Sequence, residues 1–301
     1  MIFKDILLKI MDLLAFVPDE PYLKLMYLIR MRKPLHLNPP VTLSEKTQYL
    51  KIHDHSPEYP MMADKYEAKA YVAKVAGEKY VIPCLGVWER AEDIDFDSLP
   101  DKYVLKCTHD SGSYIIVTDK SELNKEKTIK YFAKAVKRNY YNSKREWSYH
   151  GVKGRIIAEQ LLENTDLEGN VLDDPTPPEY KFFCFNGEPK IILTIMRAYK
   201  DDSKTFRHFY DEKWNLIPVG LHGQKPLLDA EKKPDQFEEM YELAKKFSKD
   251  IPSLRVDFYL IGGRVYVGEL TFYHQSGFEP FNPHEYDRIF GEYLDLGAFM
   301  S

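Results

Sequence analysis

The chain has 301 residues, of which 44% are hydrophobic and 30% are charged, and its net charge is −5. This composition supports one large domain or two ordinary ones, excludes a largely disordered chain and argues against a general nucleic-acid-binding protein. The three cysteines, Cys84, Cys107 and Cys184, lack CxxC spacing, which excludes a cysteine zinc site and predicts reduced thiols in a cytoplasmic protein.

The first 76 residues are predicted to be mostly helical. "MIFKDILLKIMDLLAFV" carries apolar residues at helical spacing that charged residues interrupt. It predicts an amphipathic helix that is too interrupted to span a bilayer. Packing onto the body of the protein and contact with a membrane surface or a partner are the alternatives. Pro18–Pro21 and Leu37–Pro40 break the helical region.

Two further helices are expected before the first strands. Residues 42–55 predict a helix with Thr42 or Ser44 as its N-cap, and residues 62–77 predict another. Strands are expected from residue 80 onward, beginning with "YVIPCLGVWE".

The middle of the chain predicts short strands around one helix. Strands are expected at 102–108, 113–119 and 154–162, and a helix at 123–141. The acidic stretch Glu163–Pro178 contains glycine and proline and predicts a loop or a boundary.

The C-terminal part predicts two hairpins and a helix. The first hairpin, over residues 179–197, turns at Asn186-Gly187, which is a strong two-residue turn signal. An amphipathic helix follows at 234–251, and the second hairpin covers 255–272. Because helices and antiparallel hairpins are mixed, we predict an α+β fold with sheets packed on helices.

The second hairpin, "RVDFYLIGGRVYVGELTF", carries charges where a core hairpin would have aliphatic residues. A two-residue turn at Gly262-Gly263 would put Asp257 and Glu269 on opposite faces. We therefore predict a three-residue loop over residues 261–263, with Gly263 left-handed, which adds one residue. The charged face then carries Arg255, Asp257, Glu269 and Thr271, with Val265 and Val267 nearer the turn. The core face carries Val256, Phe258, Leu260, Tyr266, Leu270 and Phe272.

Two acids and an arginine on one sheet face are costly unless they are paired or bind an ion. One interpretation is a surface salt-bridge cluster on a half-exposed sheet. The other is a Mg²⁺ site, because hard oxygen ligands suit a Mg²⁺ ion that bridges phosphates.

Other segments are weaker candidates for nucleotide binding. Lys106 lies in an apolar strand before Ser111-Gly112-Ser113, whose backbone N–H groups can bind phosphate. Glu159 ends an aliphatic strand whose edge can read an adenine, and Glu163 or Asp166 could hold ribose hydroxyls. The alternatives are a half-exposed strand lysine, an ordinary Ser-Gly turn and a solvent-facing glutamate.

The segment Asp93–Asp97 contains the D-x-D pattern that some glycosyltransferases use to hold a metal-bound nucleotide sugar. A solvated acidic loop is the better interpretation, because three-residue patterns match by chance. His109 and His274 lie beside the candidate phosphate and metal segments. The chain has no GxSxG, HExxH, GxGxxG or Walker A pattern.

Taken in order, these motifs resemble the ATP-grasp superfamily. More closely, the chain is similar to the teichuronopeptide-biosynthesis (TupA-like) ATP-grasp family of bacterial surface-polysaccharide gene clusters. The similarity covers roughly residues 43 to 285. The matching stretches are "ADKYEAKAYV", "LPDKYVLKCTHDSGSYIIVTDKS", "EYKFFCFNGEPK", "FYDEKWN" and "RVDFYLIGGRVYVGELTFYHQSGFEPFNP".

The resemblance implies an ATP-grasp fold in which two α+β lobes with antiparallel sheets enclose a nucleotide cleft. It implies an N-terminal helical region at 1–62, a first lobe at 63–160 and a second lobe at 161–301. It also implies ATP and Mg²⁺ as cofactors.

The resemblance further assigns site residues by motif position. The residues implied for the ATP phosphates are Lys65 and Lys106, with Ser111, Gly112 and Ser113 in a flexible loop over them. The residues implied for adenine are Glu159 and the backbone of Gln160 to Leu162. Asp166 is also implied in ATP binding. The implied Mg²⁺ ligands are Asp257, Glu269 and Thr271, and the implied catalytic residues are Arg255 and Lys181. The implied substrate-side residues are Ser276, Gly277, His274 and Arg197. The chain departs from the superfamily pattern at Thr271, where Asn is frequent, and at Glu179, where Asp is expected.

The implied activity is ATP-dependent amide formation between a carboxylate and an amine through an acylphosphate. A uronic acid with an amino acid, or an amino acid with an amino sugar, would be the substrates of a cytoplasmic enzyme associated peripherally with membrane polysaccharide assembly. No nucleic-acid partner is expected. A glycosyltransferase and a catalytically silent nucleotide-binding scaffold are the alternatives.

Overall fold

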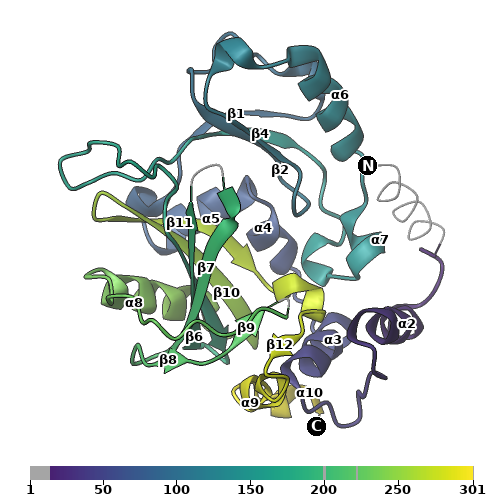
Figure 1. The fold of residues 1–301 in the computed structure, drawn as a ribbon. Coiled ribbons are helices and arrows are strands. Elements are labelled where there is room, and N and C mark those ends of the chain that lie inside the picture. The colour runs from purple at the N-terminus through teal and green to yellow at the C-terminus, as the bar shows by residue number, and fades with distance from the viewer. Residues whose placement is uncertain (1–13, 199–200, 222, 301) are drawn as a thin grey trace.

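The computed structural model describes residues 14–198, 201–221 and 223–300. Most of the amphipathic helix predicted over residues 1–17 therefore lies outside the described part. Two large antiparallel sheets, a small two-stranded sheet and flanking helices form the described part of the molecule (Figure 1), which confirms the predicted α+β class. Within the described ranges, no helix is both long enough and apolar enough to cross a membrane.

The N-terminal helices begin where the sequence signals place them. Helix α2 (Asp19–Met31) starts directly after Pro18. Helix α3 (Leu43–His53) has Thr42 as its N-cap, and this decides between the two predicted caps. The Thr42 hydroxyl accepts from the Glu45 amide at 3.2 Å, and the Glu45 carboxylate accepts from the Thr42 amide at 3.0 Å. This capping box satisfies backbone donors at the helix start.

The single helix predicted over residues 62–77 is in fact two helices, α4 (Tyr59–Ala63) and α5 (Glu67–Val75). The prediction was wrong because Asp64 interrupts the periodic pattern. Its carboxylate accepts from the backbone amides two and three residues later, at 2.9 and 3.0 Å, and so caps the second helix. Lys65 consequently lies in the break between the helices.

The first sheet has the strand order β1-β4-β2-β3. Its strands are β1 (Cys84–Trp88), β2 (Tyr103–Cys107), β3 (Tyr114–Val117) and β4 (Ile156–Gln160). Helix α6 (Lys125–Ala135) covers one face, where Phe132 packs with Tyr103, Leu105 and Cys107. The helix predicted over 123–141 therefore ends early, and the short α7 (Tyr140–Lys144) follows it.

The second sheet has the order β11-β10-β5-β6-β7-β8. Its strands are β5 (Glu179–Phe185), β6 (Glu188–Ala198), β7 (Asp201–Asp211), β8 (Leu216–Ile217), β10 (Ser253–Ile261) and β11 (Arg264–Thr271). The predicted turn between β5 and β6 is confirmed, since Asn186 and Gly187 have φ values of 49° and 85°. The sequence analysis did not identify β7.

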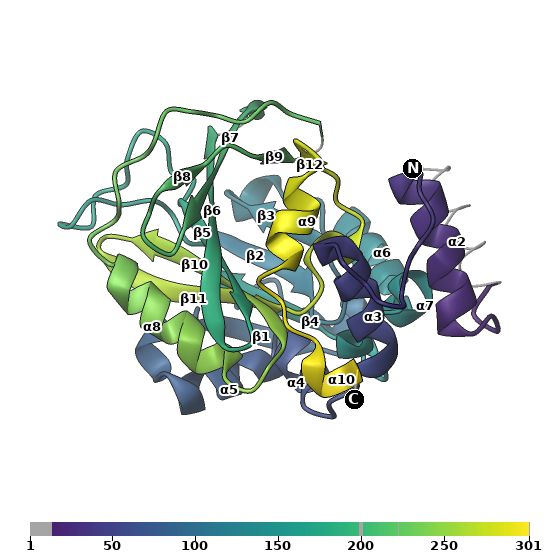
Figure 2. The ribbon, with the colours of Figure 1, turned by 90° about the horizontal axis from the view of Figure 1, so that it is seen from below.

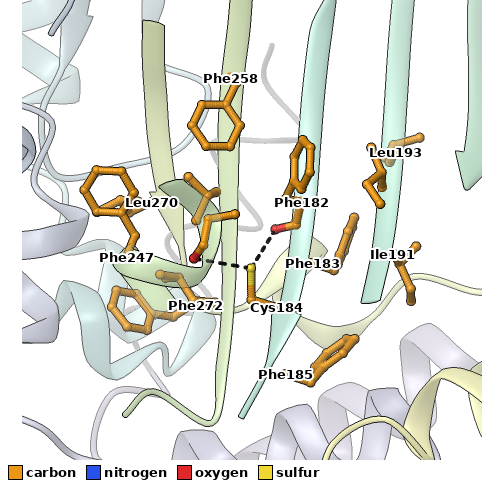
Figure 3. Close-up of a cluster of buried hydrophobic side chains, with 14 of the residues drawn as sticks. Phe182, Phe183, Cys184, Phe185, Ile191, Leu193, Phe247, Phe258, Leu270 and Phe272 are labelled. Carbon is orange, nitrogen blue, oxygen red and sulfur yellow. Dashed lines mark hydrogen bonds between the residues drawn. The ribbon is translucent and has the colours of Figure 1, made fainter. Parts of the chain in front are cut away.

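Helix α8 (Phe237–Ser248) covers the outer face of this sheet (Figure 2). Figure 3 shows the core there, with Phe182 and Phe258 meeting edge to face at a centroid distance of 5.4 Å. The Cys184 thiol lies between Phe182 O and Ala244 O at 3.6 and 3.8 Å. Burial raises the pKa of Cys184 to about 12, so this thiol stays protonated, and all three cysteines are free.

The remaining elements close the C-terminal side of the molecule. Strands β9 (Gly220–Leu221) and β12 (Phe281–Asn282) form a two-stranded sheet. Helices α9 (Tyr286–Gly291) and α10 (Gly297–Met300) lie beside α3 (Figures 1 and 2). Three separate apolar clusters support α2, the first sheet and the second sheet, and the predicted domain boundaries stay a prediction.

The hairpin of β10 and β11 aligns the two acids by a different device from the predicted one. Ile261 pairs with Arg264, so the turn has two residues, Gly262-Gly263, and the predicted three-residue loop is wrong. The extra residue is Gly268, a β-bulge between the pairs Phe258–Val267 and Asp257–Glu269. The predicted placement of Asp257 and Glu269 on one face is confirmed.

The position of the bulge changes the face assignment near the turn. Val265 and Val267 were predicted on the charged face, but they are 3% and 7% exposed and belong to the core. Tyr266 was predicted in the core, but it pairs with Tyr259 on the charged face. The register shifts by one residue only beyond Gly268, which reverses the faces on the turn side of the bulge.

The bulge predicts a stability effect at Gly268. A Cβ there would lie 2.7 Å from the ring of Tyr259, so Gly268→Ala should destabilise the protein by about 1–3 kcal/mol in urea denaturation. The double variant Gly268→Ala/Tyr259→Leu should lose less than the sum of the two single variants. Wild-type stability of Gly268→Ala would contradict this account of the bulge.

Candidate active site

A row of charged side chains crosses three adjacent strands on one face of the second sheet. Glu269 on β11 lies opposite Asp257 on β10, and Asp257 lies opposite Lys181 on β5. Arg255 lies two residues before Asp257 on the same face, opposite Thr271. The alternation of β-strands therefore concentrates the charges on one side and the phenylalanine core on the other.

Asp257 is buried and held by two cations. Arg255 Nε and Nη2 donate to its two carboxylate oxygens at 2.6 and 2.7 Å, in a bidentate pair. Lys181 Nζ donates to Asp257 Oδ2 at 2.6 Å and also contacts Glu179 Oε2 at 2.7 Å. Burial raises the pKa of Asp257, but Arg255 and Lys181 outweigh it, so the net shift is downward. The carboxylate is ionised at neutral pH.

Glu269 is the second acid in the row and is partly buried. Its Oε1 accepts from the Thr271 hydroxyl at 2.8 Å, and Arg255 Nη2 donates to that hydroxyl at 3.1 Å. Burial raises its pKa, but Lys65, Arg255 and Lys181 together lower it below the ordinary value although Asp257 opposes them. Two ionised carboxylates and a hydroxyl therefore lie side by side.

A second charged cluster belongs to the first sheet. Glu159 on β4 is buried, and its two carboxylate oxygens contact Lys106 on β2 and, at 2.6 Å, Lys69 on α5. Lys69 also donates to Ile82 O at 2.7 Å. Lys69 is not among the predicted site residues, although the helix predicted over residues 62–77 would place it one turn from Lys65.

The two clusters line one cavity between the sheets. Its polar walls are Lys65, Lys69, Glu159 and Glu269, with Gly268 beside them. Its apolar walls are Met62, Ala63, Ala68, Val72, Val81, Ile82, Val267 and Leu270. The structure thus brings predicted residues from both halves of the chain to a common space with a mixed apolar and charged lining.

The loop between β2 and β3 lies near Lys65. Lys65 Nζ donates to Asp110 O at 2.5 Å, and the Lys65 amide donates to Thr108 O at 3.1 Å. Ser111 and Gly112 are exposed. Ser113 is buried, and its hydroxyl donates to the Asp110 carboxylate. The predicted phosphate loop therefore presents its exposed part next to the α4–α5 break.

Several predicted residues lie away from the cavity lining. Gln160 is exposed at the end of β4, and Leu162 is half-buried in the connection that follows. Asp166 is half-buried and accepts from the Asn170 amide and side chain at 2.8 and 2.9 Å, which lowers its pKa. These contacts close its own turn. Arg197 is 40% exposed and pairs with Glu179, the partner of Lys181.

The D-x-D segment is also outside the cavity. Asp93 lies 3.8 Å from Arg90, and Asp95 accepts from the Ser98 amide at 3.3 Å, both at exposed positions. His109 is buried, and its ring contacts Arg138 O at 3.0 Å. These residues stabilise local structure.

The candidate substrate-side residues form a turn beyond β11. His274, Ser276 and Gly277 belong to the 3-10 segment His274–Gly277. His274 Nδ1 accepts from Arg255 Nη1 at 2.5 Å, so the turn contacts the charged row directly. Ser276 is buried against α3.

The donor set at the charged row fits a hard divalent cation in its chemistry. Asp257, Glu269 and Thr271 offer only oxygen ligands, and both acids are ionised. Among the described residues, the charged row included, there is no group of three or more His, Cys, Asp or Glu side chains placed to hold a metal ion. Asp257 is engaged by Arg255 and Lys181, so a cation could bind only if these contacts loosened.

Comparison with protein families gives one match across most of the chain. The family model described as TupA-like ATPgrasp matches residues 45–295. No curated protein matches the chain.

Solved ligases share structural similarity at low sequence identity. A D-alanine–D-alanine ligase from Bacillus anthracis has a TM-score of 0.42 and 17% identity over 78% of this chain and 60% of its own. An L-amino acid ligase from Bacillus licheniformis has a TM-score of 0.48 and 13% identity over 87% of this chain and 59% of its own. The chain thus spans only about 60% of the length of these ligases.

The Glu159 cluster predicts a strong dependence of stability on one carboxylate. Glu159→Gln leaves Lys69 and Lys106 without their shared anion and should cost about 3 kcal/mol in urea denaturation. Glu163→Gln, the same change at the exposed pair with Lys102, should cost less than about 1 kcal/mol. Equal losses for the two variants would contradict the importance of the buried cluster.

The same carboxylate predicts the sign of an acid effect. Burial raises the pKa of Glu159, but the combined effect of Lys106 and Lys69 is larger and opposite. The pKa therefore lies below its ordinary value of 4.5. The unfolded chain therefore takes up this proton first, and the stabilisation is lost as the pH falls below 4.5. Wild type should lose more stability than Glu159→Gln over that acid range.

Proposed function

The chain belongs to the TupA-like ATP-grasp family, and from this membership we propose that the protein is an ATP-dependent carboxylate–amine ligase. Its product would be an amide formed through an acylphosphate. The observation that carries the proposal is the cavity lined by Lys65, Lys69, Glu159 and Glu269. Cations for a polyphosphate and one proposed ligand of its metal ion, Glu269, thus line the same space.

Lysines and backbone amides would hold the triphosphate. Lys65 and Lys106 supply compact positive charges near the β2–β3 loop. The exposed Ser111 and Gly112 present backbone N–H groups of the kind that bind phosphate. The strand end from Glu159 to Leu162 is the proposed adenine edge, and a ribose contact by Asp166 would require its turn to open.

Asp257, Glu269 and Thr271 are the proposed Mg²⁺ ligands. When bound, Mg²⁺ would neutralise negative charge that develops on the phosphates during transfer. Lys181 and Arg255, which contact Asp257 in this structure, are donors that can also bind negatively charged groups of the substrates.

The proposed reaction has two steps. A carboxylate oxygen of the acid attacks the γ-phosphorus, and the bond between that phosphorus and the ADP oxygen breaks. The amine then attacks the acyl carbon, phosphate leaves and the amine loses a proton. Arg255 would stabilise the charge on the transferring phosphoryl group and on the tetrahedral intermediate. Lys181 would lie near the triphosphate or the acceptor.

For the substrates we propose a uronic acid or another sugar of a bacterial surface polysaccharide and an amino acid or amine. The resemblance of the chain to the teichuronopeptide-biosynthesis family of bacterial surface-polysaccharide gene clusters supports this pairing. Arg197 and the His274–Gly277 turn lie at the two ends of the charged row and are the proposed contacts to the acid and its acceptor.

The reaction class predicts a trapped product. With ATP, Mg²⁺ and a uronic acid or amino acid, hydroxylamine should intercept the acylphosphate and yield a hydroxamate together with ADP. Asp257→Asn should abolish the hydroxamate, because one carboxylate charge for the metal is lost. Asp93→Asn is the matched control, since Asp93 lies outside the cavity, and it should leave the yield unchanged.

Other products would decide against the ligase. Release of UDP or CMP from a nucleotide sugar, lost in Asp93→Asn, would favour a glycosyltransferase. ATP binding without product from any acid and amine tested would favour a nucleotide-binding scaffold.

A separate prediction concerns nucleotide affinity. Lys106→Met removes an ammonium group proposed to contact phosphate and should weaken Mg-ATP binding by about tenfold or more, since hydrogen bonds to charged groups contribute about 1.5–3 kcal/mol. Lys127→Met, at an exposed position of α6, is the control and should leave the affinity unchanged. Isothermal titration calorimetry measures both, and equal affinities would refute the assignment of Lys106.

A further inference from the structure

The turn after β11 has an unusual backbone. Gln275, Ser276 and Gly277 have φ values of 46°, 59° and 68°, so three consecutive residues are left-handed and two of them are not glycine. A non-glycine residue in this conformation is unfavourable and persists only when its surroundings hold it. The surroundings of this turn are therefore informative.

Two buried side chains of α3 hold the turn. Lys51 Nζ donates to Ser276 O and to Ser276 Oγ, each at 2.7 Å. Gln48 Nε2 donates to Ser276 O at 2.9 Å and to Gly277 O at 3.0 Å. Lys51 is 1% exposed and Gln48 is fully buried. The turn's carbonyls thus depend on donors that lie more than 220 residues earlier in the chain.

Further contacts hold the Lys51 ammonium group in this position. Its third hydrogen bond goes to Lys144 O at 3.0 Å, and it lies 4.8 Å from the centroid of the Phe278 ring. Burial lowers the pKa of Lys51 to about 7, against the opposing charge of Glu146. Burying a lysine is unfavourable unless its hydrogen bonds are made. This site therefore favours the one backbone conformation of the turn that makes them.

The turn, held in this position, contacts Arg255 of the charged row. His274 is the first residue of the turn, and its Nδ1 accepts from Arg255 Nη1 at 2.5 Å. The other nitrogens of Arg255 bind Asp257 and Thr271. A continuous set of hydrogen bonds and short backbone connections therefore runs from Lys51 to Arg255.

We propose that Lys51, assisted by Gln48, is a positioning residue that sets the orientation of Arg255 through the His274–Gly277 turn. Helix α3 thereby belongs to the active site, although its residues line neither side of the nucleotide cavity. The effect on catalysis rests on the proposed ligase function, whereas the effect on the turn and on His274 does not.

The test compares two identical substitutions on one helix. Lys51→Met removes the ammonium group from the turn. Lys46→Met is the matched control, because Lys46 also donates to two backbone carbonyls, at Gly291 and Leu294, but none belongs to the turn. Both variants are measured for hydroxamate formation, for hydrogen exchange of residues 272–280 and for the ring resonances of His274.

In Lys51→Met, kcat for the hydroxamate should fall by about tenfold or more, as expected for a misplaced catalytic group. KM for ATP should change by less than about twofold, because the nucleotide cavity is untouched. The turn should exchange about tenfold faster, and the His274 resonances should shift. Lys46→Met should show none of these changes.

Gln48→Met is a second variant with the same expected signature, and it decides the matter if Lys51→Met does not fold. Wild-type exchange and unshifted His274 resonances in the folded variants would overturn the proposal. So would a loss of ATP affinity that matches the loss of kcat. If wild type itself forms no hydroxamate, the ligase function fails, and the exchange and His274 measurements still decide the role of Lys51.

Discussion

The buried carboxylate of Asp257 is the constraint on which the rest of the structure depends. An unpaired charge at this depth would be very unfavourable, and Arg255 on the same strand and Lys181 on the neighbouring β5 compensate it. The pair with Lys181 requires the observed register of β10 with β5. A slip of one residue would turn Asp257 into the phenylalanine core and Phe258 into the charged row. Charge pairing and apolar burial therefore specify the same strand register.

The bulge at Gly268 extends this arrangement to the edge strand. It lets β11 bury Val267 on one side of the bulge and present Glu269 on the charged face on the other. The cavity begins at this strand and ends at Glu159 of the other sheet. The buried acids are Glu159 on the first sheet and Glu179 and Asp257 on the second, and each has two cationic partners. Of these, Glu159 with its partner Lys69 lines the cavity, whereas Asp257 lies opposite the lining residue Glu269.

The N-terminal helices are structural parts of the candidate site. The break between α4 and α5 exists because Asp64 caps the second helix, and it brings Lys65 to the loop after β2. Helix α3 reaches the other end of the charged row through Lys51. These contacts explain how a region with its own apolar cluster can influence residues on the second sheet.

The sequence alone determined those features that depend on residues close together in the chain. The start of α3 at Thr42 or Ser44 and the Asn186-Gly187 turn follow from spacing over a few residues. The shared face of Asp257 and Glu269 was predicted, but the bulge that produces it was not. The motif order also pointed to the family. Tertiary structure alone decided the rest, because Gly268 became the bulge only through the packing of Val267. In the same way, Lys69 and Lys51 acquired their partners from strands and turns far along the chain. A periodic pattern within about ten residues does not predict such contacts, because burial and charge compensation depend on segments that are far apart in the sequence.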